Sequence, residues 1–326
     1  MNANDLQDYL EKNRNIFLSW GNFVSSKIQS ELKEKIGIDE VKNFVKLPIK
    51  PRVKDVNSAV GKVARKGYTN PISQMTDFVG VRFVVLLSDD ITKLCNIIES
   101  QEYWNAVLSK DYQDEIEKRP KTFDYQSQHY EVRPKSDFEF EGHTITTEMC
   151  CEIQIRTLLQ HAYAELVHDS IYKPVGTVPH KAERQVARSM ALMETTDELF
   201  CSTMKLLTDT NKPRNDFLNS LTSIYKNKIS ADLLKTDLKT NYALLDEFRE
   251  FIKDNVLLEI AELVDEKKYI LIKTKSRAVE SSFFAQPVVL FVYWLAANID
   301  KKELQRKWSL PGYYGELETV LSDMDM

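Results

Sequence analysis

The sequence predicts an α/β (α+β) fold, in which a mixed β-sheet flanked by helices is followed by a mainly helical C-terminal extension. Between about residues 48 and 175, short segments rich in Val, Ile and Phe alternate with longer amphipathic segments, which is typical of strands and helices that share one core. After residues 211–213 (Asn-Lys-Pro) the pattern is helical. The chain therefore divides into an α/β part and a helical part.

The individual elements follow from these patterns in order along the chain. Helix is expected over residues 4–47, where apolar residues recur at helical spacing and no proline occurs before Pro48. Strands are expected at residues 78–87, 104–109, 125–133 and 146–155, joined by a charged loop at 110–124 and a polar turn at 135–143. Further helices are expected at 90–100, 157–172, 180–207, 216–226, 231–235, 241–264 and 287–299, with a short strand or turn at 269–275.

The length of the chain predicts several compact units, because single domains commonly hold about 100–200 residues and this chain has 326. We expect an N-terminal helical segment at residues 1–47, an α/β domain at 48–210 and a helical accessory region at 211–326. The sequence shows no internal repeat.

Composition is that of an ordinary soluble protein, with 43% hydrophobic and 29% charged residues. No segment reaches the roughly 18–20 apolar residues of a membrane helix, and acidic residues stand near the N-terminus where a secretory signal would be basic and apolar. The cysteines form no CxxC pair, so we expect free buried thiols rather than disulfides or a zinc site. These observations predict a cytoplasmic protein that does not contact membranes.

Basic residues gather locally, although the net charge of the chain is −5. From Lys42 to Lys66, Asp55 is the only acid among many lysines and arginines. Such a patch suits a small polyanion better than a long one, and a solvated helix face would show the same pattern. Within this segment one row of side chains would share a helix face and offer hydrogen bonds to successive phosphates. The row follows Arg52 and consists of Lys54, Ser58 and Lys62.

Residues 151–156 alternate between apolar and polar side chains, which predicts a strand with two different faces. Glu152, Gln154 and Arg156 share one face, and the residues between them (Cys151, Ile153 and Ile155) share the other. The polar face is either an ordinary solvated face or the floor of a binding site.

Thr157 begins a segment with helical spacing, in which His161, Glu165 and His168 fall on one face. Their spacing could suggest zinc, but no HExxH motif or nearby third ligand accompanies them. The histidines are therefore not expected to bind a metal.

Two further motifs carry residues suited to phosphate chemistry. Asp77 stands at the entry to an apolar strand, where a carboxylate can hold Mg²⁺ together with phosphate oxygens, or can cap a turn. Lys110 opens a basic loop that leads to Tyr125 and His129, a combination suited to phosphates and one stacked base, or to a charged hairpin loop. No Walker A loop, GxGxxG or GxSxG motif occurs in the chain, so phosphate chemistry here would use another fold.

Taken in order, these motifs form a specific combination over about 120 residues. The order is Arg-x-Lys-x3-Ser, Asp-Phe-Val-Gly-Val-Arg, Lys-Asp-Tyr, Tyr-Gln-Ser-x-His, Glu-Ile-Gln-Ile-Arg-Thr and a closing His-x3-Tyr-Lys. This closely resembles the synthetase domain of the RelA/SpoT alarmone enzymes, which has a nucleotidyltransferase-like fold. The resemblance covers roughly residues 48–200. Asp124 stands where the family commonly has glycine, and Tyr163 where it commonly has tryptophan.

The resemblance implies transfer of pyrophosphate from ATP to the 3′-hydroxyl of GDP or GTP, which yields (p)ppGpp. It assigns Asp77 and Glu152 to Mg²⁺, with Glu152 also as the general base. It assigns the ATP site to Arg52 and Arg82 at the adenine and to Lys54, Ser58 and Lys62 at the phosphates. It assigns the acceptor site to Lys110, Tyr125 (stacked on guanine), His129, Gln154, Arg156 and His161.

Two alternatives remain at this point: a toxin-like relative that transfers pyrophosphate to the 3′ end of tRNA, and a binding module without activity. The second is disfavoured because a pure binder need not keep Asp77 and Glu152. About 47 residues precede the core, too few for the hydrolase domain of the long family members, so alarmone hydrolysis is not expected. A homo-oligomer is left open by the sequence.

Overall fold

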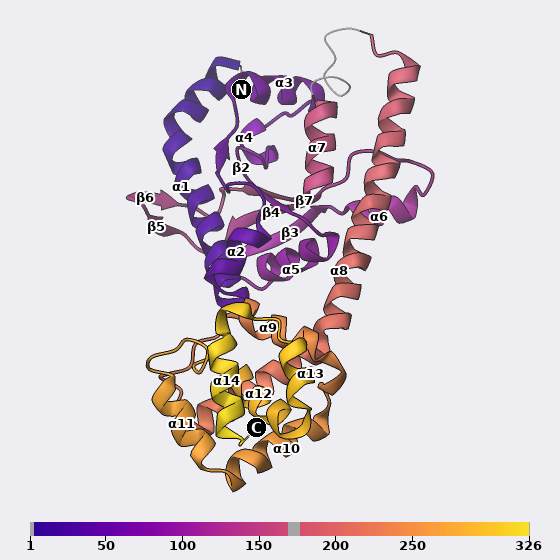
Figure 1. Ribbon diagram of the computed structural model, residues 1–326. Helices are drawn as coiled ribbons and strands as arrows, with labels where there is room; N and C mark the ends of the chain where they lie inside the picture. Colours follow the sequence, from indigo (N-terminus) through magenta and orange to yellow (C-terminus); the bar gives the residue numbers. More distant parts are fainter. Residues whose placement is uncertain (1–2, 169–176, 326) are drawn as a thin grey trace. The chain divides into compact units, whose positions relative to one another are not determined.

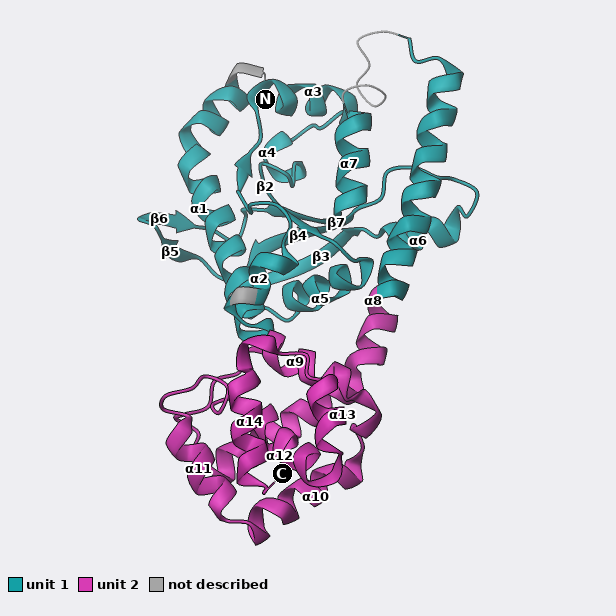
Figure 2. Ribbon diagram, viewed as in Figure 1, with its two compact units in different colours: residues 1–203 teal, residues 204–326 magenta. Residues whose placement is uncertain are grey.

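The structure is a computed structural model that describes residues 3–168 and 177–325. The chain divides into two compact units, residues 1–203 and 204–326 (Figure 2). The division falls inside the long helix α8 (His180–Lys228), whereas the predicted boundary at residue 210 lies one or two turns further along the same helix.

The first unit is built on a mixed sheet of five strands in the order β1-β2-β7-β4-β3 (Figure 1). The central pair, β2 (Val79–Val85) and β7 (Cys151–Thr157), is parallel, and every other neighbouring pair is antiparallel. The remaining strands are β1 (Arg52–Val53), β3 (Trp104–Lys110) and β4 (Gln128–Pro134). A separate hairpin joins β5 (Phe138–Phe140) to β6 (His143–Ile145). The predicted mixed sheet flanked by helices is therefore confirmed.

The helices of this unit lie between and beside the strands in sequence order. They are α1 (Ala3–Ile36), α2 (Ile38–Phe44), α3 (Val56–Lys66), α4 (Pro71–Gln74), α5 (Ser88–Glu99), α6 (Tyr112–Lys118), α7 (Leu158–Val167) and the first part of α8. The expected loop at 110–124 contains helix α6, because Asp111 caps the helix by accepting hydrogen bonds from the backbone N–H groups of Gln113 and Asp114. The expected turn at 135–143 contains the β5–β6 hairpin.

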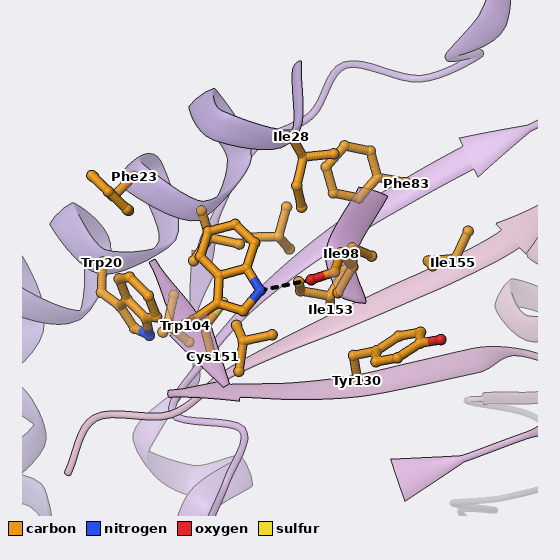
Figure 3. Close-up of a cluster of buried hydrophobic side chains, with 14 of the residues drawn as sticks. Trp20, Phe23, Ile28, Phe83, Ile98, Trp104, Tyr130, Cys151, Ile153 and Ile155 are labelled. Carbon is orange, nitrogen blue, oxygen red and sulfur yellow. Dashed lines mark hydrogen bonds between the residues drawn. The ribbon is translucent and has the colours of Figure 1, made fainter. Parts of the chain in front are cut away.

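One face of the sheet is apolar, and helices α1 and α5 pack against it. Figure 3 shows Trp20, Phe23 and Ile28 of α1 near side chains of this face. Alternate residues of β7, namely Cys151, Ile153 and Ile155, are completely buried on this face, as the period of two predicted. Trp104 donates its indole N–H to the carbonyl of Ile98 at 3.0 Å, which ties the edge strand β3 to α5. The buried face thus fixes the strand register, since a slip by one residue would bury the polar set instead.

Helix α1 approaches the sheet closely at Gly21. A Cβ atom at this position would lie 2.7 Å from Cβ of Pro51 and 2.9 Å from Cγ2 of Val79. Only glycine permits this distance, so residues 4–47 do not form a loosely attached segment but part of the core of the first unit.

The second unit is helical, as predicted, and surrounds one buried helix. Helix α12 (Val288–Asn298) is buried on all sides from Val288 to Ala296. The other helices of this unit are the last part of α8, α9 (Leu238–Glu247), α10 (Asp254–Glu266), α11 (Tyr269–Arg277), α13 (Lys301–Arg306) and α14 (Tyr314–Asp323). Among the residues in the described ranges, no helix has the length and apolar character needed to cross a membrane.

Several expectations for this region were wrong. Residues 231–235 contain a turn rather than a helix, and the helix expected at 241–264 is divided into α9 and α10 by the 3-10 helix Arg249–Phe251. Residues 269–275 form helix α11 rather than a strand or turn, because Ile270 and Thr274 are buried at a four-residue step while Ile272 is 70% exposed. Helix α8 continues through Pro213, where the sequence predicted a break. Beyond Pro213, Arg214 pairs with Asp246 at 2.6 Å, and Phe217 and Leu221 are buried in the core of the second unit, so tertiary contacts favour the continuing helix.

We predict that Gly21→Ala lowers the free energy of unfolding by about 1–3 kcal/mol, because the added methyl group would overlap with Pro51 and Val79. Gly61→Ala, also inside a helix, is the matched control. There the nearest atom to a new Cβ is the flexible end of Arg65 at 3.4 Å, so alanine should raise stability by up to about 1 kcal/mol through helix propensity. Urea unfolding of both variants would measure the difference, and equal effects would contradict the close approach.

Candidate active site

The candidate site lies on the polar face of the sheet, where the registers of β2, β7 and β4 bring predicted residues into rows. Gln154 lies in the middle of one row, with Arg82 opposite it on β2 and His129 opposite it on β4. Glu152 lies in the next row, opposite Gly80 on β2 and Glu131 on β4. Residues far apart in the sequence thus face the same space because strand side chains alternate between faces.

Asp77 is held between two lysines just before β2. Its Oδ2 atom lies 2.6 Å from Nζ of Lys54 and 2.8 Å from Nζ of Lys62, while its Oδ1 atom is buried without a hydrogen-bond partner. Burial lowers the pKa of Lys62, but the hydrogen bond and charge of Asp77, with smaller contributions from the charges of Tyr68 and Glu152, raise it overall. Lys62 is therefore charged at neutral pH and lies within the electrostatic field of both acids.

The predicted phosphate row is divided between three elements. Arg52 lies on β1 and Lys54 lies between β1 and α3, so the expectation that Lys54 shares a helix with Ser58 and Lys62 was wrong. Asp55 is the reason, since its side chain accepts the backbone N–H of Ser58 and begins helix α3 after Lys54. The lysines nevertheless meet, at the carboxylate of Asp77.

Five side chains of the site form a closed ring of polar contacts. Glu152 contacts Nδ1 of His129 at 3.3 Å, and Nε2 of His129 lies 3.2 Å from the hydroxyl of Tyr125. Arg156 donates to that hydroxyl at 2.7 Å and to Oε1 of Gln154 at 2.5 Å. Gln154 donates back to Glu152 at 2.6 Å, which closes the ring. Each side chain has its orientation fixed by two others.

Burial shifts the pKa of both charged members of the ring, Glu152 and Arg156, and at Glu152 the hydrogen-bonding partners oppose this shift. Burial raises the pKa of Glu152, but the hydrogen bond and charge of His129, the hydrogen bond of Gln154 and the charge of Lys62 outweigh it and lower the pKa to about 2. Burial also lowers the pKa of Arg156, which is 2% exposed. The guanidinium stays charged at neutral pH, so the ring holds an ionised carboxylate and an ionised guanidinium.

Tyr125 lies in the segment that precedes β4, not at the start of a strand as expected. Lys110 lies beneath it at the end of β3. Its ammonium is 4.5 Å from the centre of the Tyr125 ring, 3.2 Å from the Tyr125 carbonyl oxygen and 3.2 Å from Glu115. An aromatic ring with a cation on it and a hydrogen-bonded hydroxyl is a fixed platform for a flat group.

Helix α7 forms a side wall, and Thr157 starts it with a capping box to Gln160, where the sequence predicted the change of period. Nδ1 of His161 lies 3.6 Å from Glu165, and Arg82 pairs with the same carboxylate at 3.1 Å. Burial, followed by the charges of Arg82 and Arg156, lowers the pKa of His161. His161 is therefore neutral at physiological pH. The last two predicted motif residues, Tyr172 and Lys173, lie outside the described residues.

Sequence reasoning missed several polar residues around the site. Gln126 donates to Glu194 of α8 at 2.8 Å, and Thr157 donates its hydroxyl to Asp197 of α8 at 2.6 Å. Glu131 follows His129 at a two-residue step and could have been found by the same alternation that identified Gln154. No comparable signal marks Asp197, which reaches the site only through tertiary packing.

The donor set fits Mg²⁺ that is shared with a phosphate ligand. No group of three or more His, Cys, Asp or Glu side chains in the described parts of the chain is arranged to hold a metal by itself. Mg²⁺ in nucleotide sites commonly takes one or two carboxylates and fills its remaining positions with phosphate oxygens and water. Asp77, with its unpartnered buried oxygen, and Glu152 could supply those carboxylates.

Comparison with known proteins agrees with this arrangement. Residues 51–177 match the family model described as "Region found in RelA / SpoT proteins". These residues belong to the RelA/SpoT family. The matched range contains every sheet strand of the first unit and every predicted site residue.

Two curated relatives of the RelA/SpoT region come from Bacillus subtilis (strain 168). The GTP pyrophosphokinase YjbM is 30% identical over 149 residues, which are 45% of this chain and 66% of the relative. The GTP pyrophosphokinase YwaC is 28% identical over 153 residues, which are 46% of this chain and 69% of the relative. The chain thus spans about two thirds of the length of each relative.

Solved structures are also similar to this chain. The small alarmone synthetase 1 from Bacillus subtilis aligns with a TM-score of 0.49 and 22% identity, over 61% of this chain and 99% of that one. The small alarmone synthetase 2 from the same organism aligns with a TM-score of 0.47 and 24% identity, over 59% of this chain and 98% of that one.

We predict that Asp197→Asn stabilises the protein at neutral pH. Asp197 is 5% exposed, and burial raises its pKa from 3.8 to about 6, although the hydrogen bond from Thr157 opposes the rise. Between these pH values the folded protein keeps a proton that the unfolded chain has lost, so stability falls as the pH rises through this window. At pH 7 the variant should be more stable by roughly 1–3 kcal/mol, and near pH 4 the gain should be much smaller.

Thermal unfolding at several pH values would measure this gain. Asp209→Asn changes an exposed acid on the same helix and serves as the control. A gain for Asp197→Asn that does not depend on pH would contradict the assignment of the buried carboxylate.

Proposed function

We propose that the chain is an ATP-dependent pyrophosphokinase that transfers pyrophosphate from ATP to the 3′-hydroxyl of GDP or GTP. One observation carries the proposal. A carboxylate between two lysines (Asp77) lies just before β2, the neighbour of the strand that carries a second carboxylate (Glu152), and a ring of polar contacts links Glu152 to an aromatic platform (Tyr125). The names of the curated relatives, both GTP pyrophosphokinases, support it.

On the donor side, Lys54 and Lys62 with Ser58 would bind the ATP phosphates. Both lysines point at a carboxylate, so they already lie where negative charge would gather. Arg52 and Arg82 lie on neighbouring strands at the edge of the same face and would hold the adenine between their guanidinium groups.

Asp77 and Glu152 would hold Mg²⁺ when it is bound with the nucleotide. The ion would neutralise charge that develops on the phosphate oxygens during transfer. The buried oxygen of Asp77 without a hydrogen-bond partner supports this role, because an isolated buried carboxylate oxygen is costly.

On the acceptor side, Tyr125 would stack on the guanine. Lys110 supports the ring from one side, and Arg156 and His129 fix the hydroxyl. Gln154 and the neutral His161 would line the rest of the acceptor site. These contacts hold the platform before the ligand arrives, which lowers the entropy cost of binding.

Glu152 would act on the attacking hydroxyl. The ionised carboxylate takes the proton of the 3′-hydroxyl, whose oxygen forms a bond to the β-phosphorus of ATP. The bond between the β-phosphorus and the bridging oxygen to the α-phosphate breaks, and AMP leaves with that oxygen. Positioning by the lysines and Tyr125 would bring the two substrates into line, which is the main protein contribution in this class of reaction.

Asp77→Asn and Glu152→Gln should each lower pyrophosphate transfer by at least about 100-fold. Both changes keep the shape of the side chain and remove the charge that binds the cation and, at Glu152, accepts the proton. Purified variants should remain folded by circular dichroism. Glu139→Gln, on the β5–β6 hairpin, removes an acid from an exposed position and should retain activity. Near-normal transfer by either site variant would contradict the assigned roles.

The acceptor can be identified with ATP labelled in its γ-phosphate. The protein is incubated with Mg²⁺, labelled ATP and either GDP, GTP or deacylated tRNA, and the labelled product is separated. Label on the guanine nucleotide is expected. Label on tRNA would move the proposal to the other acceptor, and absence of label on each acceptor would leave a binding module.

A further inference from the structure

Glu131 is an acid on the active face that none of the roles above uses. It lies on β4 directly opposite Glu152 of β7, and β7 separates it from β2. Its Oε1 atom accepts a hydrogen bond from the hydroxyl of Thr76 at 2.9 Å. Thr76 immediately precedes Asp77 in the short segment between α4 and β2.

The hydrogen bond between Thr76 and Glu131 spans β7, the strand between β2 and β4. Gly80 of β2 pairs with Glu152 of β7, and Glu152 pairs with Glu131 of β4, so the row runs over three strands. Thr76 belongs to the chain that leads into β2, yet its side chain contacts β4. The segment that carries Asp77 is therefore linked to the strand on the far side of β7, next to Glu152.

A second anchor holds the other side of Asp77. The backbone N–H of Lys54 donates to the carbonyl of Phe78 at 2.8 Å, which fixes the residue after Asp77 to the chain next to β1. Thr76 and Phe78 are thus held from opposite directions, and Asp77 lies between them. Lys62 of α3 and the buried side chains of Met75 and Phe78 also hold this segment, and the contact to Glu131 adds a constraint from β4.

The three carboxylates near the start of β7 have different partners. Asp77 has two lysines and Glu152 has the polar ring, whereas the partner of Glu131 is the neutral hydroxyl of Thr76.

We propose that Glu131 is a positioning residue that, through its hydrogen bond to Thr76, holds the Asp77 carboxylate in register with Glu152. The inference rests on the proposed function, since the paired carboxylates are those that would bind Mg²⁺ with ATP. Glu131 acts as a hydrogen-bond acceptor for Thr76, not as a ligand of its own.

Three variants separate a hydrogen-bonding role of Glu131 from a ligand role, and one of them, Glu131→Leu, removes both the charge and the acceptor. Thr76→Val removes the donor and keeps the charge of Glu131, whereas Glu131→Gln removes the charge and keeps a carbonyl oxygen that can accept from Thr76. We expect Thr76→Val and Glu131→Leu each to weaken the affinity for Mg²⁺–ATP, measured by titration calorimetry, and to lower kcat roughly 10- to 100-fold. Glu131→Gln should stay within a few-fold of the parent in both measurements.

The double variant Thr76→Val/Glu131→Leu tests whether the two side chains act as one unit. Its loss should be close to that of either single variant, because one hydrogen bond is broken in all three proteins. Additive losses would overturn the proposal, and so would a loss for Glu131→Gln as large as that for Glu131→Leu. Calorimetry measures the binding of Mg²⁺–ATP, so it tests the positioning role even if the parent protein transfers no pyrophosphate. Failure of the proposed function would instead appear in the transfer assay.

Thr144→Val is the matched control. The Thr144 hydroxyl donates to Glu139 at 2.5 Å in the β5–β6 hairpin, so the same kind of hydrogen bond is lost away from the site. This variant should bind Mg²⁺–ATP and turn over like the parent. Unfolding temperatures of all variants would show whether a loss comes from unfolding, and a loss in Thr76→Val that simply follows reduced stability would contradict a positioning role.

Discussion

The central strand β7 has one buried apolar face and one polar face, and the arrangement of the site depends on this division. Cys151, Ile153 and Ile155 are packed beneath α1 and α5, so the strand cannot slip or rotate without exposing them. Glu152, Gln154 and Arg156 must then face the opposite side. The apolar face thus supplies the stability, and the polar face can carry charged groups whose burial costs free energy.

On the polar face, ion pairs and hydrogen bonds between the charged groups reduce the free-energy cost of burying them. Asp77 holds two lysines, and Glu152 and Arg156 belong to a ring in which each side chain has two partners. In such a network the side chains hold one another in place without a ligand. Under the proposed function, the lysines on Asp77 would bind the phosphates of ATP. The same residues therefore stabilise the free site and would serve the proposed reaction.

The surroundings of the ring come from the helices that follow and precede the sheet. Helix α7 begins at Thr157, at the end of β7, and the first part of α8 contacts Gln126 and Thr157 through two acids. Helix α1 approaches the sheet at Gly21. Residues outside the 51–177 range that matches the RelA/SpoT family thus complete both the core and the wall of the site. The helical second unit has its own core around α12.

Local sequence determined the fold class, the two faces of β7 and the start of α7, because alternation and capping depend on neighbouring residues. It also identified most of the side chains that gather on the polar face. Tertiary structure alone decided that helix α8 continues past Pro213 and that residues 269–275 form a helix, since packing outweighs local propensity there. It also decided which distant side chains meet: Thr76 with Glu131, Thr157 with Asp197 and both lysines with Asp77. Such pairs depend on strand order and register, which no local pattern encodes.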